Sequence, residues 1–218
     1  IKGEKYDGNE YIADAFNKGG SFAITDKDNL NLDEFINRTI VYVNNTIDAI
    51  CELAKYKRDN FKGKVVGVTG SVGKTTTKDL ISSVLETEYK VLKTEGSLNN
   101  NIGLPFCILN GIDADIWVIE MGMNNFGEIS YLSKIAKPNI SVITNIGTSH
   151  IGMLGSRENI LKAKLEILEG MDTKKLIINN DNDLLHEYYL NNKEFITTVG
   201  INNDSNYNGQ ILNENEVK

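Results

Sequence analysis

The sequence predicts an α/β protein: a P-loop central domain with a mostly parallel sheet and helices on both faces, preceded by a partial, smaller α/β N-terminal domain. Three observations support this fold class. A glycine loop with Lys-Thr lies at Gly70–Thr75, short apolar runs alternate with amphipathic stretches from position 64 onward, and the first sixty residues follow a different, more polar pattern. Alternating strands and helices are typical of parallel sheets.

The apolar runs from position 64 are rich in Val and Ile and nearly continuous, which is typical of strands buried on both faces. The expected strands are Lys64–Thr69, Lys90–Leu92, Asp115–Ile119, Ile140–Thr144, Lys175–Ile178 and Phe195–Val199. The expected helices are Thr76–Glu88, Gly103–Leu109, Gly127–Ala136, Ser156–Met171 and Asp183–Asn191.

The sequence predicts a small polar unit over Ile1–Thr25, followed by a mostly helical stretch over Leu30–Lys57. We place the domains at 1–62 and 63–218, and we expect the Asn- and Glu-rich tail at 202–218 to be loop-like. The apolar stripe that suggests the helix consists of Leu32, Phe35, Ile36, Ile40, Val43, Ile47, Ile50 and Leu53.

Composition restricts the class of protein. The chain has 218 residues, 40% of them hydrophobic, so a packed core is expected, and its net charge of -7 disfavours nucleic acid as a partner. Cys51 and Cys107 have no spacing for a disulfide or a metal, which fits a reducing, cytoplasmic location. No apolar run approaches the length that spans a membrane.

The glycine loop is the strongest motif. It follows the apolar run Val65–Val68 and precedes a helical pattern, and this order builds a phosphate cradle from backbone N–H groups, a helix N-terminus and a lysine. The common form of this motif, G-x-x-x-x-G-K-[ST], has its first glycine at the position of Val68. This chain has the shorter form G-x-x-G-K-T, from Gly70 to Thr75. The alternative is a glycine-rich turn with an exposed lysine. The nucleotide-binding residues predicted from the loop are Thr69, Gly70, Ser71, Val72, Gly73, Lys74, Thr75 and Thr76.

Other candidates lie at or after predicted strand ends, where open α/β sheets bind ligands. Glu120 ends the run Ile116–Ile119 and has the form of an acid that holds Mg²⁺ beside phosphates, although strand-to-loop junctions often carry a surface glutamate. His150 could ligate a metal or orient a phosphate, and an ordinary loop histidine is an equal alternative. The Asn99–Asn101 run offers amides to a ligand or forms a turn.

Lys162 and Lys164 occupy the helix expected after His150. Residues two apart point to different helix faces, so at most one of these lysines can face the site. The residues alone favour a solvated lysine at both positions.

Five segments resemble, in order and spacing, the Mur ligases, the ATP-dependent amide ligases of peptidoglycan precursor synthesis. The opening segment Lys2–Asn9 is similar to the K/R-G-E-x-x-D-G-H of the branch that adds D-Ala-D-Ala to a UDP-N-acetylmuramoyl tripeptide, with Asn9 where that branch usually has histidine. The five segments are T-G-S-V-G-K-T-T-T (69–77), N-N-N-I-G-L-P (99–105), V-I-E-M-G (118–122), N-I-G-T-S-H (145–150) and A-K-L-E-I-L (163–168).

The resemblance implies ATP and Mg²⁺ as cofactors and assigns roles to residues. Lys74 would hold the β- and γ-phosphates, Asn101 would lie near the γ-phosphate, and Lys164 rather than Lys162 matches the lysine that the family carbamoylates. The implied metal ligands are Thr75, Glu120, His150 and, once carbamoylated, Lys164. The implied catalytic residues are Lys74, Asn101, His150 and Lys164.

The family has three domains, and the resemblance implies that this chain lacks the start of the first, the last strands of the second and all of the third. We therefore expect these 218 residues to bind nucleotide weakly and not to catalyse ligation alone. The expected substrates are the UDP-N-acetylmuramoyl tripeptide and D-Ala-D-Ala, and the expected protein is a cytoplasmic monomer. Two alternatives stay open: another Mur or folylpolyglutamate-type ligase, or a nucleotide-binding module without ligase chemistry.

Overall fold

The structure is a computed structural model that describes residues 1–3, 5–28, 30–31, 35–111, 113–213 and 216–217. Glu4 of the opening segment and Leu32 of the apolar stripe lie outside the described residues. The chain forms two compact units, Ile1–Leu53 and Ala54–Lys218. The division falls inside helix α2 (Thr46–Asn60), whereas the sequence placed the domain boundary at 62/63. The domain assignments themselves stay predictions.

The first unit contains a short 3-10 turn, a helix and two strands. Strands β1 (Phe22–Thr25) and β2 (Thr39–Tyr42) pair in parallel, and α1 (Ile12–Asn17) follows η1 (Gly8–Tyr11). Its small core is formed by buried apolar side chains with partly buried neighbours, namely Ile12, Phe16, Phe35, Ala23, Leu30 and Ile40.

The predicted helix over Leu30–Lys57 is wrong in its first half, because Thr39–Tyr42 is a strand. The run Thr-Ile-Val-Tyr consists of β-branched and aromatic residues, which favour a pleated surface over a helix. Helix α2 starts only after Asn45, whose side-chain oxygen accepts hydrogen bonds from the backbone N–H groups of Ile47 and Asp48.

The second unit is built on a seven-stranded sheet in the order β4-β5-β3-β6-β7-β8-β9, in which every neighbouring pair is parallel. The chain leaves β3 for β4 on one side and later crosses to β6 on the other, so β3 lies at the point where the direction of winding reverses. The strands are β3 (Lys64–Thr69), β4 (Val91–Lys93), β5 (Ile116–Glu120), β6 (Ile140–Ile143), β7 (Leu176–Asn179), β8 (Ile196–Gly200) and β9 (Tyr207–Asn208).

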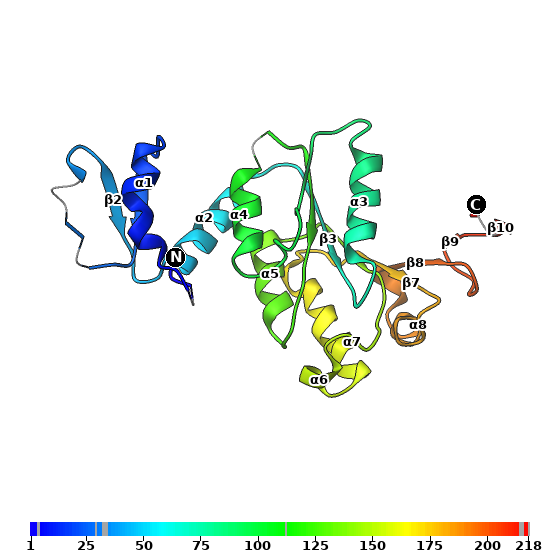
Figure 1. The fold of residues 1–218 in the computed structure, drawn as a ribbon. Helices are drawn as coiled ribbons and strands as arrows, with labels where there is room; N and C mark the ends of the chain where they lie inside the picture. Colours follow the sequence, from blue (N-terminus) through cyan, green and yellow to red (C-terminus); the bar gives the residue numbers. More distant parts are fainter. Residues whose placement is uncertain (4, 29, 32–34, 112, 214–215, 218) are drawn as a thin grey trace. The chain divides into compact units, whose positions relative to one another are not determined.

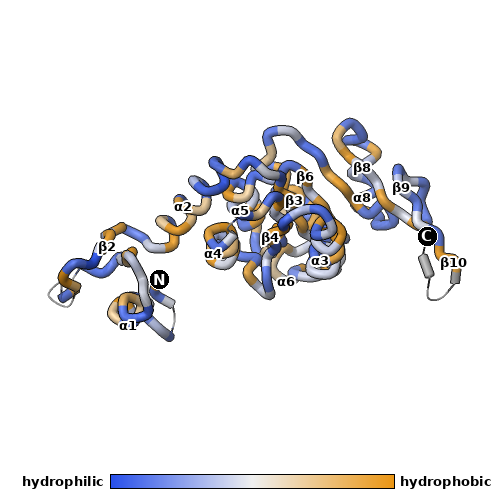
Figure 2. The backbone as a smooth tube through the Cα atoms, turned by 90° about the horizontal axis from the view of Figure 1, so that it is seen from above, coloured by the Kyte–Doolittle hydropathy of each residue, from blue (hydrophilic) through white to orange (hydrophobic). Residues whose placement is uncertain are grey.

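Helices cover both faces of this sheet, as the sequence predicts (Figure 1). On one face, Ile81 and Leu85 of α3 (Lys74–Leu85) pack on a cluster around Val68. On the other face, Gly67 lies against Pro138 and Ile167, so this layer includes α5 (Glu128–Ala136) and the 3-10 helix η3 (Glu166–Gly170). Figure 2 shows hydrophobic backbone segments gathered around β3 and β6. The remaining helices are α4 (Gly103–Asn110), α6 (Ile151–Leu154), α7 (Arg157–Leu165), α8 (Asp183–Leu190) and η4 (Lys193–Phe195).

The helix predicted over Ser156–Met171 is shorter than expected and continues as η3. Ser156 caps α7 by accepting from the backbone N–H of Asn159, and α7 ends at Leu165. The Ser133 hydroxyl then donates to the carbonyl of Ile167, and the Glu166 carboxylate accepts the backbone N–H of Gly127. These contacts with α5 and the residue preceding it accompany the tightening of the last turns into a 3-10 helix.

The tail over 202–218 is not wholly loop-like. The Asp181 carboxylate accepts the backbone N–H groups of Ile201, Asn202 and Asn203, which turns the chain so that β9 pairs with β8. Two further short strands, β10 (Ile211–Asn213) and β11 (Glu216–Val217), pair with each other. Across the part of the chain that the structure describes, no helix is both long and apolar enough to cross a membrane.

Candidate nucleotide-binding site

The predicted phosphate cradle connects the end of β3 to the first turn of α3. Gly73 precedes the helix with φ +79°, a left-handed conformation that glycine adopts without the steric cost that a Cβ brings. A Cβ on Gly70 would overlap the Thr144 hydroxyl, so the loop also needs glycine for close approach to β6. Helix α3 begins at Lys74, two residues earlier than predicted, which places Lys74 and Thr75 in its first turn.

The loop is held by hydrogen bonds to groups outside it. The Thr144 hydroxyl donates to the Val72 carbonyl at 2.6 Å, and the Ser71 N–H donates to the Asn145 carbonyl at 2.8 Å. The Ser71 hydroxyl is buried without a hydrogen-bond partner, one of two such side-chain atoms in the described part of the chain. A buried hydroxyl without a partner is costly, so a ligand oxygen at this loop would satisfy it.

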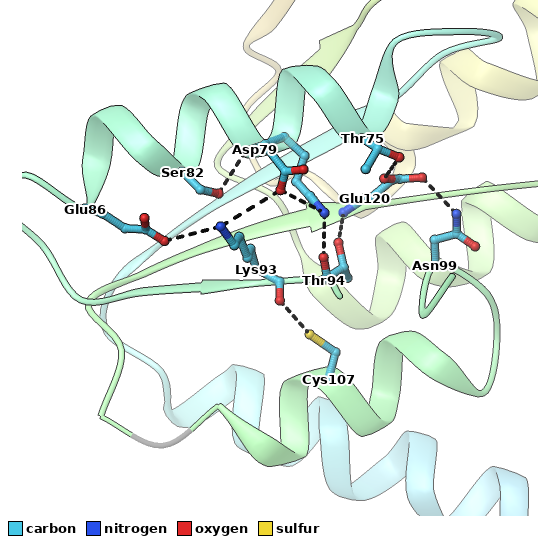
Figure 3. A network of polar contacts seen from close by, with 10 residues as sticks. Thr75, Asp79, Ser82, Glu86, Lys93, Thr94, Asn99, Cys107 and Glu120 are labelled. Atoms are coloured by element: carbon cyan, nitrogen blue, oxygen red, sulfur yellow. Dashed lines mark hydrogen bonds and ion pairs between the residues drawn. The ribbon is translucent and has the colours of Figure 1, made fainter. Parts of the chain in front are cut away.

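Glu120 lies beside the cradle. Its Oε2 accepts a hydrogen bond from Thr75 Oγ1 at 2.8 Å, and its Oε1 accepts one from the side-chain amide of Asn99 at 2.9 Å (Figure 3). The residue is 3% exposed, because β5 pairs with β3 on one side and β4 on the other. The predicted proximity of the glycine loop and this acid is therefore present.

Asn99 is a site residue that sequence reasoning did not select. Its position in the Asn99–Asn101 run was a signal, but three adjacent amides cannot be ranked without the course of the loop. The structure shows Asn99 in contact with Glu120, Asn100 accepting the N–H groups at the start of α4, and Asn101 exposed.

The two candidate lysines of α7 differ sharply. Lys162 is exposed, whereas Lys164 is 2% exposed and has no ion-pair partner within the described residues. Burial, reinforced by the positive charge of Lys74, lowers the pKa of Lys164 to about 7. The expectation from the residues alone, a solvated lysine at both positions, is therefore confirmed for Lys162 and wrong for Lys164.

His150 immediately precedes α6 and has φ +67°, a left-handed conformation in which histidine is more frequent than bulkier residues. Partial desolvation lowers the pKa of its imidazole, and the ammonium groups of Lys164 and Lys74 lower it further, against the opposing charge of Glu128. His150, Lys164 and Lys74 thus share one electrostatic environment, which favours a neutral imidazole.

A group of three or more His, Cys, Asp or Glu side chains suited to a metal is absent from the described residues. Of the predicted metal ligands, the Glu120 carboxylate and the Thr75 hydroxyl lie in direct contact with each other. Hydroxyl and carboxylate oxygens beside a phosphate cradle are the donors that Mg²⁺ uses with nucleotides, since phosphate oxygens and water complete its coordination. The residues present therefore fit a nucleotide-bound Mg²⁺ better than a site made of protein ligands alone.

Comparison with known proteins decides the family. The profile described as "Mur ligase middle domain" matches residues 68–218. The chain belongs to the Mur ligase family. A Bacillus subtilis relative named UDP-N-acetylmuramoyl-tripeptide--D-alanyl-D-alanine ligase is 42% identical over 218 residues, covering 99% of this chain and 47% of the relative. The chain thus spans about half the length of the curated relatives it matches.

Solved Mur ligase structures have the same fold. MurF from Thermotoga maritima, crystallised in complex with ADP, aligns with a TM-score of 0.84 and 31% identity over 100% of this chain and 50% of that one. MurF from Acinetobacter baumannii aligns with a TM-score of 0.80 and 33% identity over 92% of this chain and 44% of that one. The predicted α/β fold class and the family resemblance are confirmed.

Proposed function

We propose that this chain is the nucleotide-binding part of an ATP-dependent ligase that joins D-Ala-D-Ala to a UDP-N-acetylmuramoyl tripeptide. The observation that carries the proposal is the Thr75–Glu120 hydrogen bond, which joins a phosphate cradle to a buried acid. The names of the curated relatives support the proposed substrates, and the ADP complex of the Thermotoga maritima protein supports the proposed nucleotide.

The cradle would bind the triphosphate of ATP through its backbone N–H groups, and Lys74 would neutralise the β- and γ-phosphates. In this structure the Lys74 ammonium donates to the Gly70 carbonyl at 3.1 Å, so the lysine lies over the loop and can exchange that weak contact for phosphate oxygens. Thr75 and Glu120 would hold Mg²⁺, which supplies charge neutralisation of the phosphates. The neutral imidazole of His150 is suited to the same metal or to a phosphate oxygen.

The proposed reaction makes an amide in two steps. A carboxylate oxygen of the tripeptide attacks the γ-phosphorus, the bond to the β-phosphate oxygen breaks, and ADP leaves. The amine of D-Ala-D-Ala then attacks the acyl carbon, loses a proton and displaces inorganic phosphate. The chain's contribution is positioning and charge stabilisation, because phosphoryl transfer needs no protein nucleophile.

Lys164 is proposed to be carbamoylated. Carbon dioxide reacts with a neutral amine, and a pKa of about 7 leaves a large neutral fraction at physiological pH. The product is an anion, which would reverse the unfavourable burial of an unpaired ammonium next to Lys74. Loss of Lys164 should then be partly rescued by short carboxylates in the assay.

The test is ATP consumption by the gene product that carries this sequence, with the carboxylate and amine substrates supplied together and singly. We expect continued ADP release over many turnovers only when both are present, and we expect Lys74→Ala to abolish it while the exposed control Lys162→Ala leaves it unchanged. ATP consumption without either substrate, or none under any condition despite nucleotide binding, would favour a module without ligase chemistry.

A further inference from the structure

Buried Lys78 lies one turn after Lys74 in α3. It is 3% exposed, its ammonium donates to the backbone carbonyl of Thr94 at 2.7 Å, and it pairs with Asp79 at 3.1 Å. Asp79 is half-exposed and also lies 3.9 Å from Lys93, in an outer network of exposed ion pairs (Figure 3). Exposed ion pairs contribute little to stability, so the main interaction of the Lys78 ammonium is its buried hydrogen bond to the Thr94 carbonyl.

Thr94 lies where β4 ends beside β5. Lys93 and Val118 are the last paired residues of the two strands. One more ladder hydrogen bond follows them, from the Thr94 N–H to the Val118 carbonyl at 3.2 Å. In a regular parallel ladder the next bond would run from the Glu120 N–H to the Thr94 carbonyl. The structure has a different arrangement: the Glu120 N–H donates to the Thr94 side-chain hydroxyl at 2.8 Å, and the carbonyl accepts from Lys78 instead.

We propose that Lys78 and Thr94 together end the β4–β5 ladder and thereby position Glu120 and Asn99 for the nucleotide-bound metal, an inference that rests on the proposed function. The Lys78 ammonium donates to the Thr94 carbonyl, which the ladder would otherwise use. The Thr94 hydroxyl replaces that carbonyl as the acceptor for the Glu120 N–H. The backbone is thus released from the sheet at residue 94, and the following loop can turn back so that Asn99 reaches the Glu120 carboxylate.

Lys78 and Thr94 are positioning residues, because they act on the carboxylate through Asn99 and the backbone of Glu120. Their removal should have opposite effects on the ladder. Thr94→Val leaves the Glu120 N–H without an acceptor while Lys78 still holds the carbonyl. Adding Lys78→Met frees the carbonyl, so the ladder can extend by one bond and protect the same N–H again.

The first experiment measures hydrogen exchange at the Glu120 amide in the ligand-free chain by NMR. We expect exchange to accelerate at least about tenfold in Thr94→Val, since the amide loses its acceptor. Exchange should return toward the wild-type rate in the double variant Thr94→Val/Lys78→Met. Thr94→Ser, which keeps the hydroxyl, should match the wild type. Equal exchange in Thr94→Val and the double variant would overturn the proposal.

The second experiment measures Mn²⁺-ADP binding by EPR, with Mn²⁺ as the probe for the metal. Loss of a residue that orients a metal ligand typically reduces metal affinity about 10- to 100-fold, and we expect that loss in Lys78→Met and in the double variant, with recovery in Lys78→Arg. Wild-type affinity in the double variant would overturn the positioning role, because an extended ladder should misplace Asn99.

Fluorescence of Trp117, the single tryptophan, reports whether each variant folds. If Lys78→Met does not fold, both experiments compare Thr94→Val with Thr94→Ser instead. Identical amide exchange rates and identical Mn²⁺-ADP affinities in these two variants would overturn the proposal. The exchange result needs no nucleotide. Failure of the wild-type chain to bind Mn²⁺-ADP would therefore contradict the proposed function, whereas the exchange data would still test whether Lys78 and Thr94 end the β4–β5 ladder.

Discussion

The hydroxyl of Thr75 donates a 2.8 Å hydrogen bond to the carboxylate of Glu120, which joins the first turn of α3 to the end of β5. The two residues are 45 positions apart in the sequence, and they meet because β5 pairs directly with β3, the strand that leads into the glycine loop. Two oxygen donors of different chemistry therefore lie at one point beside the cradle, and this contact can be tested directly.

Thr75→Val removes the hydroxyl while keeping the shape of the side chain. We expect the Mg²⁺ concentration that half-saturates nucleotide binding to rise about tenfold, because one oxygen donor is lost. Thr75→Ser keeps the oxygen and should stay near the wild type. Isothermal titration with ADP over a series of Mg²⁺ concentrations measures the effect, and identical curves for Val and Ser would rule out a metal role for Thr75.

Asn99→Ala removes the amide that donates to Glu120 Oε1, so the carboxylate can rotate away from Thr75. We expect Mg²⁺-dependent nucleotide binding to weaken about tenfold or more. Asn100→Ala is the matched control: it removes the acceptor for the N–H groups of Ile102 and Gly103, which should cost about 1 kcal/mol of stability without changing the Mg²⁺ dependence.

The same titration on Asn101→Ala distinguishes the role implied by the family resemblance from the contact in the structure. A larger loss for Asn101 than for Asn99 would show that the γ-phosphate contact, and not support of Glu120, is the main function of this loop.

Gly73→Ala places a Cβ on a residue with φ +79°. No neighbouring atom is closer than 4.0 Å to that Cβ, so the expected cost of about 1–2 kcal/mol comes from the left-handed backbone alone. Gly152→Ala is the control, since Gly152 has open space around a Cβ and its φ is not in the left-handed region. Urea unfolding followed by Trp117 fluorescence gives both free energies, and equal values would contradict the cradle geometry.

Lys164 makes stability depend on pH in a defined direction. Its folded pKa of about 7 lies below the ordinary lysine value of 10.5, so between these values the unfolded chain binds more protons than the folded one. The contribution of Lys164 to the free energy of unfolding therefore rises with pH, by at most about 1.4 kcal/mol per pH unit, and its burial penalty is fully present below pH 7.

The variant Lys164→Met provides the reference for this effect. In CO₂-free buffer it should be more stable than the wild type near pH 6.5, and the difference should shrink as pH rises to 10. Denaturant unfolding at several pH values measures the difference, and a constant difference would show that Lys164 keeps an ordinary pKa.

Much of the second unit could be predicted from local patterns. The strand Lys64–Thr69 is found as predicted. Of the other predicted strands, Ile140–Thr144 ends one residue earlier than predicted, and the rest begin and end one residue later. Strands buried on both faces leave an uninterrupted run of Val and Ile, and the glycine loop has its own chemical signature, so neighbouring residues were sufficient. The helix predicted over Leu30–Lys57 was wrong because its apolar spacing fits both a helix and the strand at Thr39–Tyr42.

The sequence by itself determined the parallel α/β layout and the identity of the residues at the cradle, since both depend on groups within a few positions of each other. Only the tertiary structure decided that Asn99 supports Glu120, that Lys164 is buried while Lys162 is exposed, and that Lys78 takes the carbonyl of Thr94. Each of these joins elements far apart in the chain, and the energies of burial and of a satisfied hydrogen bond depend on partners that only folding brings within reach.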